Sequence, residues 1–84
     1  MTLCACVSLA PGAAKIRVTN TASDVAGCAA AGNIHVPRTA DGTIDGGNAS
    51  NQFRNQAVGL GANTALVTSG FLRIPTEGIA YRCP

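Results

Sequence analysis

Short segments in which polar and apolar residues alternate run along this chain, and residues typical of turns separate them. Alternation places the apolar side chains on one face of a half-buried β-strand. Five segments alternate in this way or have a short apolar centre: 15–19, 33–36, 64–68, 71–74 and 79–83. In the last of them, Ile79, Tyr81 and Cys83 share a face that we expect to point inward. The chain is therefore expected to form a small sheet of short strands.

One segment has a helical pattern instead. Its apolar residues are spaced four and three apart along one face: Phe53, Ala57 and Leu60. We expect Asn48 or Ser50 to cap the N-terminus of this helix and Gly61 to end it in a left-handed conformation. Gly59 costs about 1 kcal/mol relative to alanine inside a helix. Its presence suggests that another part of the chain packs closely against it.

Three other segments are less regular. Residues 24–32 are consistent with a short capped helix that ends at Gly32, or with an extended segment and a turn, which we favour. Residues 38–47 contain two Asp-Gly pairs and no apolar period, which is typical of a mobile loop. Residues 7–13 include Pro11-Gly12 and are expected to form a spacer.

Together these elements predict an α+β domain, with a small, mainly antiparallel sheet of about four short strands and one helix packed on one face. Of the 84 residues, 46% are hydrophobic, but 15 of these are alanine. In a chain of this size, a core built largely from such small side chains rarely supplies more than ~3–5 kcal/mol of stability without a cross-link or a partner. We expect a single domain over residues 14–84, preceded in residues 1–13 by the remnant of a lipoprotein signal and a tether.

Cys28 and Cys83 lie 55 positions apart within the expected domain. No second cysteine or histidine lies near either of them at the spacing of zinc ligands, so zinc binding is not expected. In an exported protein such a pair most simply forms a disulfide, which would stabilise the fold by about 4 kcal/mol on the chain-entropy model. The alternative is a pair of reduced, buried thiols in a cytosolic protein.

The first six residues, Met1 to Cys6, resemble the lipobox at which bacterial lipoproteins are cleaved and acylated. Small residues precede the cut in exported proteins, and the thiol of the new first residue, here Cys6, would carry the lipid. Only five residues precede Cys6, whereas a signal has a basic segment and an apolar stretch of about 7–15 residues. We therefore expect Met1 to lie inside a longer signal. In the alternative, Cys4 and Cys6 simply lie near an unstructured start.

The charge distribution argues against nucleic-acid binding, and the hydropathy argues against a transmembrane helix. The six basic residues are spread along the chain and the net charge is +2, whereas nucleic-acid binding usually concentrates Lys and Arg on one face. We expect no nucleic-acid partner. The chain has no run of about 18 apolar residues, so we expect no transmembrane helix.

No catalytic site, metal site or cofactor is expected. His35 lacks a neighbouring nucleophile or carboxylate motif. Asp41 and Asp45 fit turns better than a calcium loop, which needs more carboxylates at closer spacing. We expect Asn55 to turn inward and satisfy backbone groups of a neighbouring strand, and Arg54 to face solvent.

Three groups of residues carry a resemblance to a known family: Val25-Ala26-Gly27-Cys28 with Gly32, Arg54-Asn55-Gln56-Ala57 leading into Leu60-Gly61-Ala62-Asn63-Thr64, and Gly78 with Tyr81-Arg82-Cys83. In this order they resemble small bacterial envelope lipoproteins of unassigned function, which are distantly similar to the outer-membrane stress sensor RcsF. The resemblance covers about residues 14–84. It implies an α+β domain, a lipid on the first mature cysteine and a disulfide between Cys28 and Cys83, but no chemistry. Proteins like RcsF hold two disulfides in the folded domain, whereas this chain has cysteines for one there, which argues against carrying over a signalling role.

We therefore expect a lipid-anchored protein of the bacterial cell envelope, in the outer membrane and facing the periplasm. It is expected to act as a small binding or structural module without catalysis. Its partners are then the membrane, through a lipid on Cys6, and an envelope protein. The alternative is an envelope stress sensor or regulatory lipoprotein that contacts a protein partner through loop 38–47.

Overall fold

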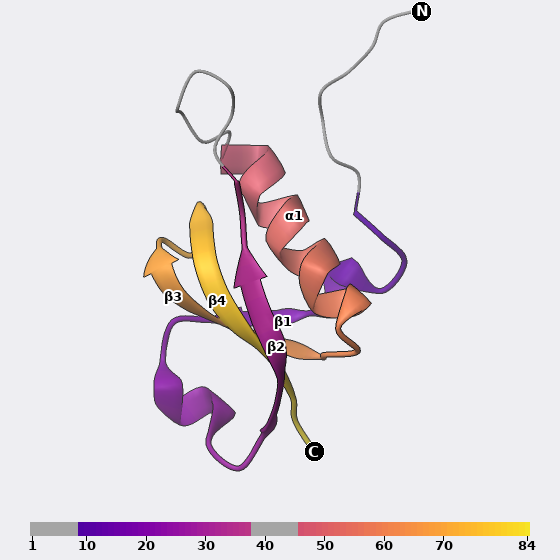
Figure 1. The fold of residues 1–84 in the computed structure, drawn as a ribbon, viewed down its shortest axis with the longest axis vertical. Coiled ribbons are helices and arrows are strands. Elements are labelled where there is room, and N and C mark those ends of the chain that lie inside the picture. The colour runs from indigo at the N-terminus through magenta and orange to yellow at the C-terminus, as the bar shows by residue number, and fades with distance from the viewer. Residues whose placement is uncertain (1–8, 38–45) are drawn as a thin grey trace, which may run out of the picture.

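The computed structural model describes residues 9–37 and 46–84, which form one α-helix, two short 3₁₀ helices and four strands (Figure 1). In chain order these elements are η1 (Ala13–Lys15), β1 (Arg17–Thr19), η2 (Ala22–Val25), β2 (Ala29–His35), α1 (Gly46–Gly59), β3 (Thr64–Gly70) and β4 (Pro75–Arg82). The predicted α+β class is confirmed.

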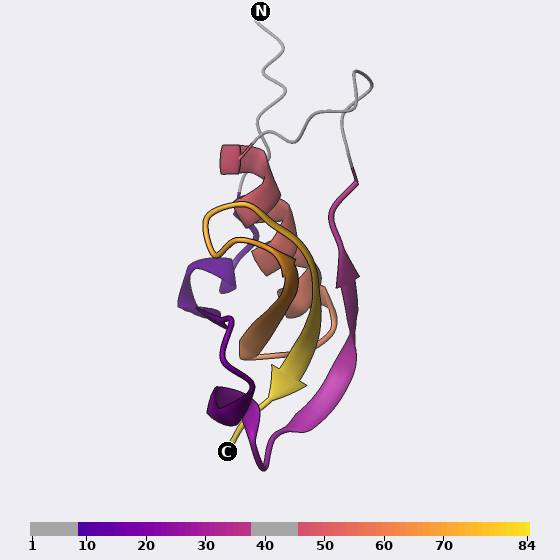
Figure 2. The ribbon, with the colours of Figure 1, turned by 90° about the vertical axis from the view of Figure 1, so that its left-hand side faces the viewer.

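The four strands form one mixed sheet in the order β1-β3-β4-β2. β4 pairs antiparallel with both β3 and β2, while β1 runs parallel to β3. α1 crosses one face of this sheet and contacts β4, β2 and β3, with η1 beside it (Figures 1 and 2). The sheet is mainly antiparallel and has its helix on one face, as the sequence predicts.

The face of the sheet under α1 is built from small residues. Directly opposed residues share a face, and the register aligns Ala65 with Ala80 and Val67 with Gly78. Ala65 and Ala80 are fully buried, as is Phe53, whose ring lies against Gly78. Because these residues are small, the helix approaches the strands closely. Phe53 then fills the centre of a core that contains few large side chains.

The second face of the sheet carries larger residues under less cover. Ile79 lies there opposite Leu66, and both are half-buried, as is Tyr81. η2 packs on part of this face and buries Val25. The predicted alternation in β4 is confirmed. The expectation that Ile79, Tyr81 and Cys83 point toward the main core is wrong, because the small residues between them face the helix.

The start of α1 and its last turn differ from the prediction. The helix begins at Gly46, two residues before Asn48, the first of the expected caps. A Cβ added at Gly59 would have no neighbour within 4 Å outside the helix's own backbone. The expectation that another segment packs closely against Gly59 is therefore wrong, and the low helix propensity of glycine has no packing contact there to offset it.

The end of α1 follows the prediction. Gly61 has a φ of +76°, and its N–H donates a hydrogen bond to the Val58 carbonyl (2.9 Å). The N–H of Ala62 donates to the Ala57 carbonyl (3.0 Å). These two bonds form a Schellman motif, in which glycine supplies the left-handed residue because it has no Cβ.

Several predicted strand bounds are wrong. β1 begins at Arg17, because Lys15, the first residue of the predicted strand 15–19, belongs to η1. Residues 71–74 connect β3 to β4 instead of forming a strand, because Gly70, with a φ of +89°, turns the chain and pairs with Pro75. Pro75 opens β4 instead of ending a strand. β2 begins at Ala29, earlier than the predicted residue 33. The favoured interpretation of residues 24–32 is thus confirmed from Ala29 on, while its first residues belong to η2.

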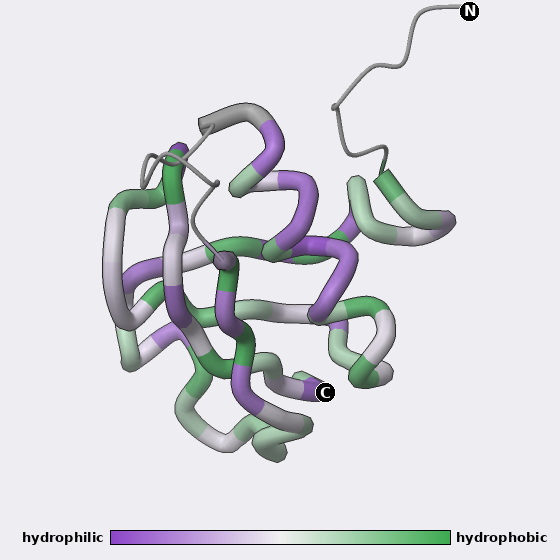
Figure 3. The backbone as a smooth tube through the Cα atoms, turned by 45° about the horizontal axis from the view of Figure 1, so that its top comes forward, coloured by the Kyte–Doolittle hydropathy of each residue, from purple (hydrophilic) through white to green (hydrophobic). Residues whose placement is uncertain are grey.

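Apolar residues do not gather in one long segment. Hydrophobic and hydrophilic positions alternate over short distances along the backbone (Figure 3), and the buried apolar residues meet between α1 and the sheet. Within residues 9–37 and 46–84, no helix combines the length and the apolarity that crossing a membrane requires.

Candidate functional site

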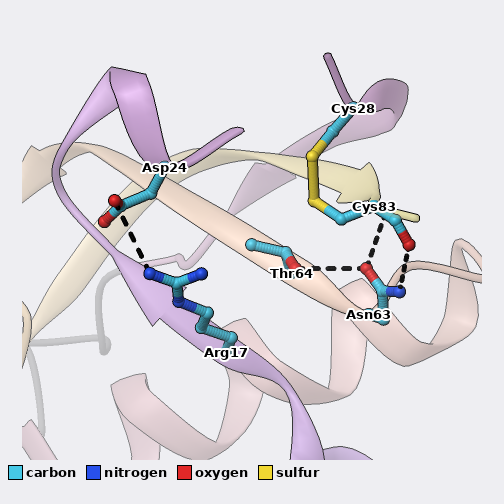
Figure 4. The surroundings of a disulfide bond; sticks show 6 residues. All are labelled: Arg17, Asp24, Cys28, Asn63, Thr64 and Cys83. Carbon is cyan, nitrogen blue, oxygen red and sulfur yellow. Dashed lines mark hydrogen bonds and ion pairs between the residues drawn. A yellow bond between two sulfur atoms is a disulfide. The ribbon is translucent and has the colours of Figure 1, made fainter. Parts of the chain in front are cut away.

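A disulfide joins Cys28 to Cys83 at the end of the sheet where β2 begins and β4 ends (Figure 4). Antiparallel pairing places Ala29 opposite Arg82, so the residues just beyond these two strand ends also meet. The Cα atoms of the two cysteines are 4.4 Å apart, which lies within the range that disulfides span. The predicted disulfide is confirmed, and strand register explains how it joins positions 55 apart in the sequence.

Asn63, the residue before β3, holds the strand end that carries Cys83. Its side chain accepts a hydrogen bond from the Cys83 N–H (2.8 Å) and donates one to the Cys83 carbonyl (2.9 Å) (Figure 4). Its own N–H donates to the Tyr81 carbonyl (3.0 Å), and its carbonyl accepts from the Arg17 N–H (3.1 Å). One asparagine thus links β1, β4 and the disulfide. No local sequence pattern predicts this role for Asn63, because these backbone partners lie 18 or more positions away.

Polar contacts also tie η2 to β1 near the disulfide. The Thr19 hydroxyl donates to one carboxylate oxygen of Asp24, and the Arg17 guanidinium lies 3.5 Å from the other (Figure 4). The Arg17 side chain is 64% exposed and the Asp24 side chain 34%, and ion pairs near the surface contribute at most about 1 kcal/mol. Together the two contacts join η2 to β1.

Two polar residues of α1 fasten the start of the described chain to the helix. Arg54 is half-buried and donates hydrogen bonds to the carbonyls of Ile16 and Ala13 (3.4 Å to Ala13). The expectation that it faces solvent is therefore wrong. Asn55 accepts a hydrogen bond from the Ala10 N–H (2.7 Å). It satisfies a backbone group, as predicted, but in the segment before η1 and not in a strand.

Gln56 holds the outer edge of β2. Its amide oxygen accepts from the His35 N–H (3.1 Å), and its amide nitrogen donates to the His35 carbonyl (2.6 Å). The side chain therefore occupies the position that a further strand would take. The sequence gave no signal for this contact, because it joins two residues 21 positions apart.

His35 lies on the surface beside an acidic residue. Its Nδ1 atom is 3.5 Å from Oε2 of Glu77, its partner across the β2–β4 register, and the two side chains are 71% and 55% exposed. The structure thus supplies a carboxylate neighbour that no local sequence motif revealed. Within residues 9–37 and 46–84, no three His, Cys, Asp or Glu side chains gather so as to hold a metal ion.

The connection between β3 and β4 exposes apolar side chains. Phe71 is 76% exposed, Leu72 46% and Ile74 37%. The N–H of Phe71 donates to the Ile74 carbonyl, and the N–H of Ile74 donates to the Phe71 carbonyl, both at 3.1 Å. This segment, residues 71–74, is called the apolar turn below. The sequence does not reveal this turn, because a short apolar run is also typical of a strand.

Several predicted residues lie outside the described part of the chain: Cys4, Cys6, Asp41 and Asp45. The same holds for residues 38–45 of the expected partner-binding loop 38–47, whereas its last two residues belong to α1.

Fold and site together define a small α+β domain in which a disulfide joins the ends of two neighbouring strands and helix side chains fasten the chain that leads into the domain. Comparison of this chain with protein-family models, with curated proteins and with solved structures finds no match.

Proposed function

We propose that this chain is a lipid-anchored protein of the bacterial cell envelope, a small binding or structural module that faces the periplasm and catalyses no reaction. The observation that carries this proposal is the disulfide between Cys28 and Cys83. Structural disulfides form and persist in oxidising compartments, which include the bacterial periplasm. The lipobox-like residues that end at Cys6 supply the second argument.

The contacts at the start of the described chain fit an anchored domain. The segment expected to be a spacer is held from Ala10 on, where Asn55 binds its N–H, and Ala13 is fully buried. An extended chain spans at most about 3.3–3.6 Å per residue. A lipid on Cys6, four residues before Ala10, would therefore keep this edge of the domain within about 14 Å of the membrane surface.

The polar groups near His35 fit a surface role. Both side chains, His35 and Glu77, are more than half exposed to solvent. The backbone of His35 is held by Gln56 from the neighbouring helix. The arrangement supports a surface contact between β2 and β4 more than a general base held against a substrate.

The test is expression in a Gram-negative host with the genomic DNA upstream of the Met1 codon kept in frame. We expect mass spectrometry to find the mature chain starting at an acylated Cys6, and cell fractionation to find it with the membranes. Cys6→Ser should move the protein out of the membrane fraction, whereas the matched control Cys4→Ser should leave it there. An unmodified Cys6, or equal fractionation of both variants, would contradict the proposal.

The alternative proposal, a stress sensor or regulatory lipoprotein that contacts its partner through loop 38–47, rests on the Asp-Gly pairs in that loop. Deletion of residues 38–45 leaves α1 intact from its first residue. Under this alternative, the deletion abolishes capture of the envelope partner by cross-linking while circular dichroism shows an unchanged fold. Unchanged capture by the folded deletion variant would remove the alternative.

A further inference from the structure

Exposed large apolar side chains are few in the described part of the chain and are concentrated in one place. They are Leu9, Phe71, Leu72 and Ile74. Three of these four belong to the apolar turn, the four-residue connection between β3 and β4. Scattered single apolar residues on a surface need no explanation, but a local cluster marks an interaction site.

The backbone that carries these side chains is held in a tight turn. Two reciprocal hydrogen bonds between Phe71 and Ile74 close it, and Gly70 pairs with Pro75 directly below it. A Cβ on Gly70 would lie within 3.0 Å of the Ile74 carbonyl oxygen, so the chain folds back tightly at this point. Little backbone entropy is therefore lost when Phe71 and Leu72 enter an apolar environment.

The position of the turn indicates what that environment is. Along the vertical axis of Figures 1 and 2, the turn and the first described residues both lie in the upper half, on opposite sides of the view in Figure 1, and η2 and the C-terminus lie in the lower half. The chain from the proposed lipid site therefore enters the domain on the half that carries the apolar turn. Its own exposed apolar residue, Leu9, precedes the contact between Ala10 and Asn55.

The single charge in the turn fits the same surface. Arg73 is exposed between Leu72 and Ile74, and an arginine near an anionic lipid surface contributes attraction to the headgroups. Apolar and aromatic side chains beside a basic residue are typical of segments that insert into the headgroup region.

We propose that the apolar turn is a second membrane contact, in which Phe71, Leu72 and Ile74 enter the headgroup region of the bilayer and Arg73 binds anionic lipid phosphates. This inference rests on the proposed lipid anchor, which holds the domain near the membrane, but the contact itself is a property of the turn. The domain then lies with the half that carries the turn against the bilayer, and η2 and the disulfide point away from it.

The test uses the absence of tryptophan from the chain. Phe71→Trp places a fluorescent reporter in the turn, and Ala22→Trp, at an exposed residue of η2 in the other half, is its control. Both are made in full-length Cys6→Ser protein without lipid, so that the result is independent of the anchor. With vesicles of phosphatidylethanolamine and phosphatidylglycerol, the indole emission of the turn reporter should shift to shorter wavelength and be quenched by brominated acyl chains. The emission of the control reporter in η2 should not change.

Three variants measure the contribution of each group. Phe71→Ser and Leu72→Ser should each lower the vesicle partition coefficient at least about tenfold, as expected for a large apolar side chain that no longer leaves water. Arg73→Gln should lower it about fivefold on vesicles with phosphatidylglycerol and not on neutral vesicles, whereas Arg82→Gln, at the far end of β4, should change neither.

The outcomes separate the two proposals. If Cys6 is not acylated but the turn reporter is quenched by vesicles, the proposed lipid anchor is contradicted and the proposed membrane contact is supported. If the indole of the turn reporter stays in water when vesicles are added, or if Phe71→Ser instead dissociates a dimer seen in analytical ultracentrifugation, the membrane contact is overturned, whatever the state of Cys6.

Discussion

Removal of the disulfide should cost this domain most of its stability. The bond closes a loop of 55 residues, which on the chain-entropy model lowers the entropy of the unfolded chain by about 14 cal/mol/K, or about 4 kcal/mol at 25 °C. The core between α1 and the sheet holds one large aromatic side chain, Phe53, among alanines and a few aliphatic residues. A domain of this size is expected to have only about 3–5 kcal/mol of net stability.

The perturbation is the double substitution Cys28→Ser and Cys83→Ser, made in a Cys4→Ser, Cys6→Ser parent so that no other thiol can form a disulfide. We expect the free energy of unfolding to fall by about 4 kcal/mol. For a domain of 60–100 residues, 1 kcal/mol corresponds to about 4–8 °C. The midpoint of thermal unfolding should therefore fall by about 16–32 °C, and the variant should be largely unfolded at 37 °C.

The assay is urea unfolding followed by far-ultraviolet circular dichroism, on the parent with and without a phosphine reductant and on the double variant. The reduced parent and the double variant should agree with one another, because both lack the same cross-link. A stability within about 1 kcal/mol of the oxidised parent would refute the reasoning, since the fold would then not depend on the bond. It would also weaken the argument for an oxidising compartment.

Three further substitutions test the packing, each by urea unfolding. Gly78→Ala should destabilise the domain by about 1–3 kcal/mol, because the new Cβ would lie within 3.0 Å of the Leu66 carbonyl oxygen and the Phe53 ring. An unchanged unfolding midpoint would show that helix and sheet separate easily. Gly59→Ala should stabilise by about 1 kcal/mol, since the added methyl meets nothing, and a loss of stability contradicts this. Arg54→Met should cost about 1–2 kcal/mol because two backbone carbonyls lose a charged donor, whereas no change would mean that water replaces the guanidinium.

The elements that could be predicted are those with a local periodic signal. Alternation marked β1, the second half of β2 and part of β4, and a short apolar centre marked β3. The spacing of Phe53 and Ala57 marked α1 with its end at Gly61. The prediction failed where one local pattern suits two structures. Residues 71–74 are apolar enough for a strand, but the chain turns there because β4 folds back along β3 from Gly70.

The candidate site also has one part that the sequence predicts and one that it does not. The cysteine pair could be predicted from its residue types and the size of the chain, and the register of β2 and β4 confirms it. The roles of Arg54, Gln56 and Asn63 could not, because each side chain binds backbone groups 20 or more positions away. Helix position alone predicts only which face such a residue lies on.

By itself the sequence determined the α+β class, the helix and its end, and the need for a cross-link in a chain whose apolar residues are mostly small. Local propensity and side-chain volume decide these properties, and both are present in the amino-acid order. Only the tertiary structure decided which face of β4 meets the helix, how the start of the described chain is fastened, and that Phe71 and Leu72 remain exposed. These properties depend on contacts between segments that are distant in the sequence, and the local sequence does not predict such contacts.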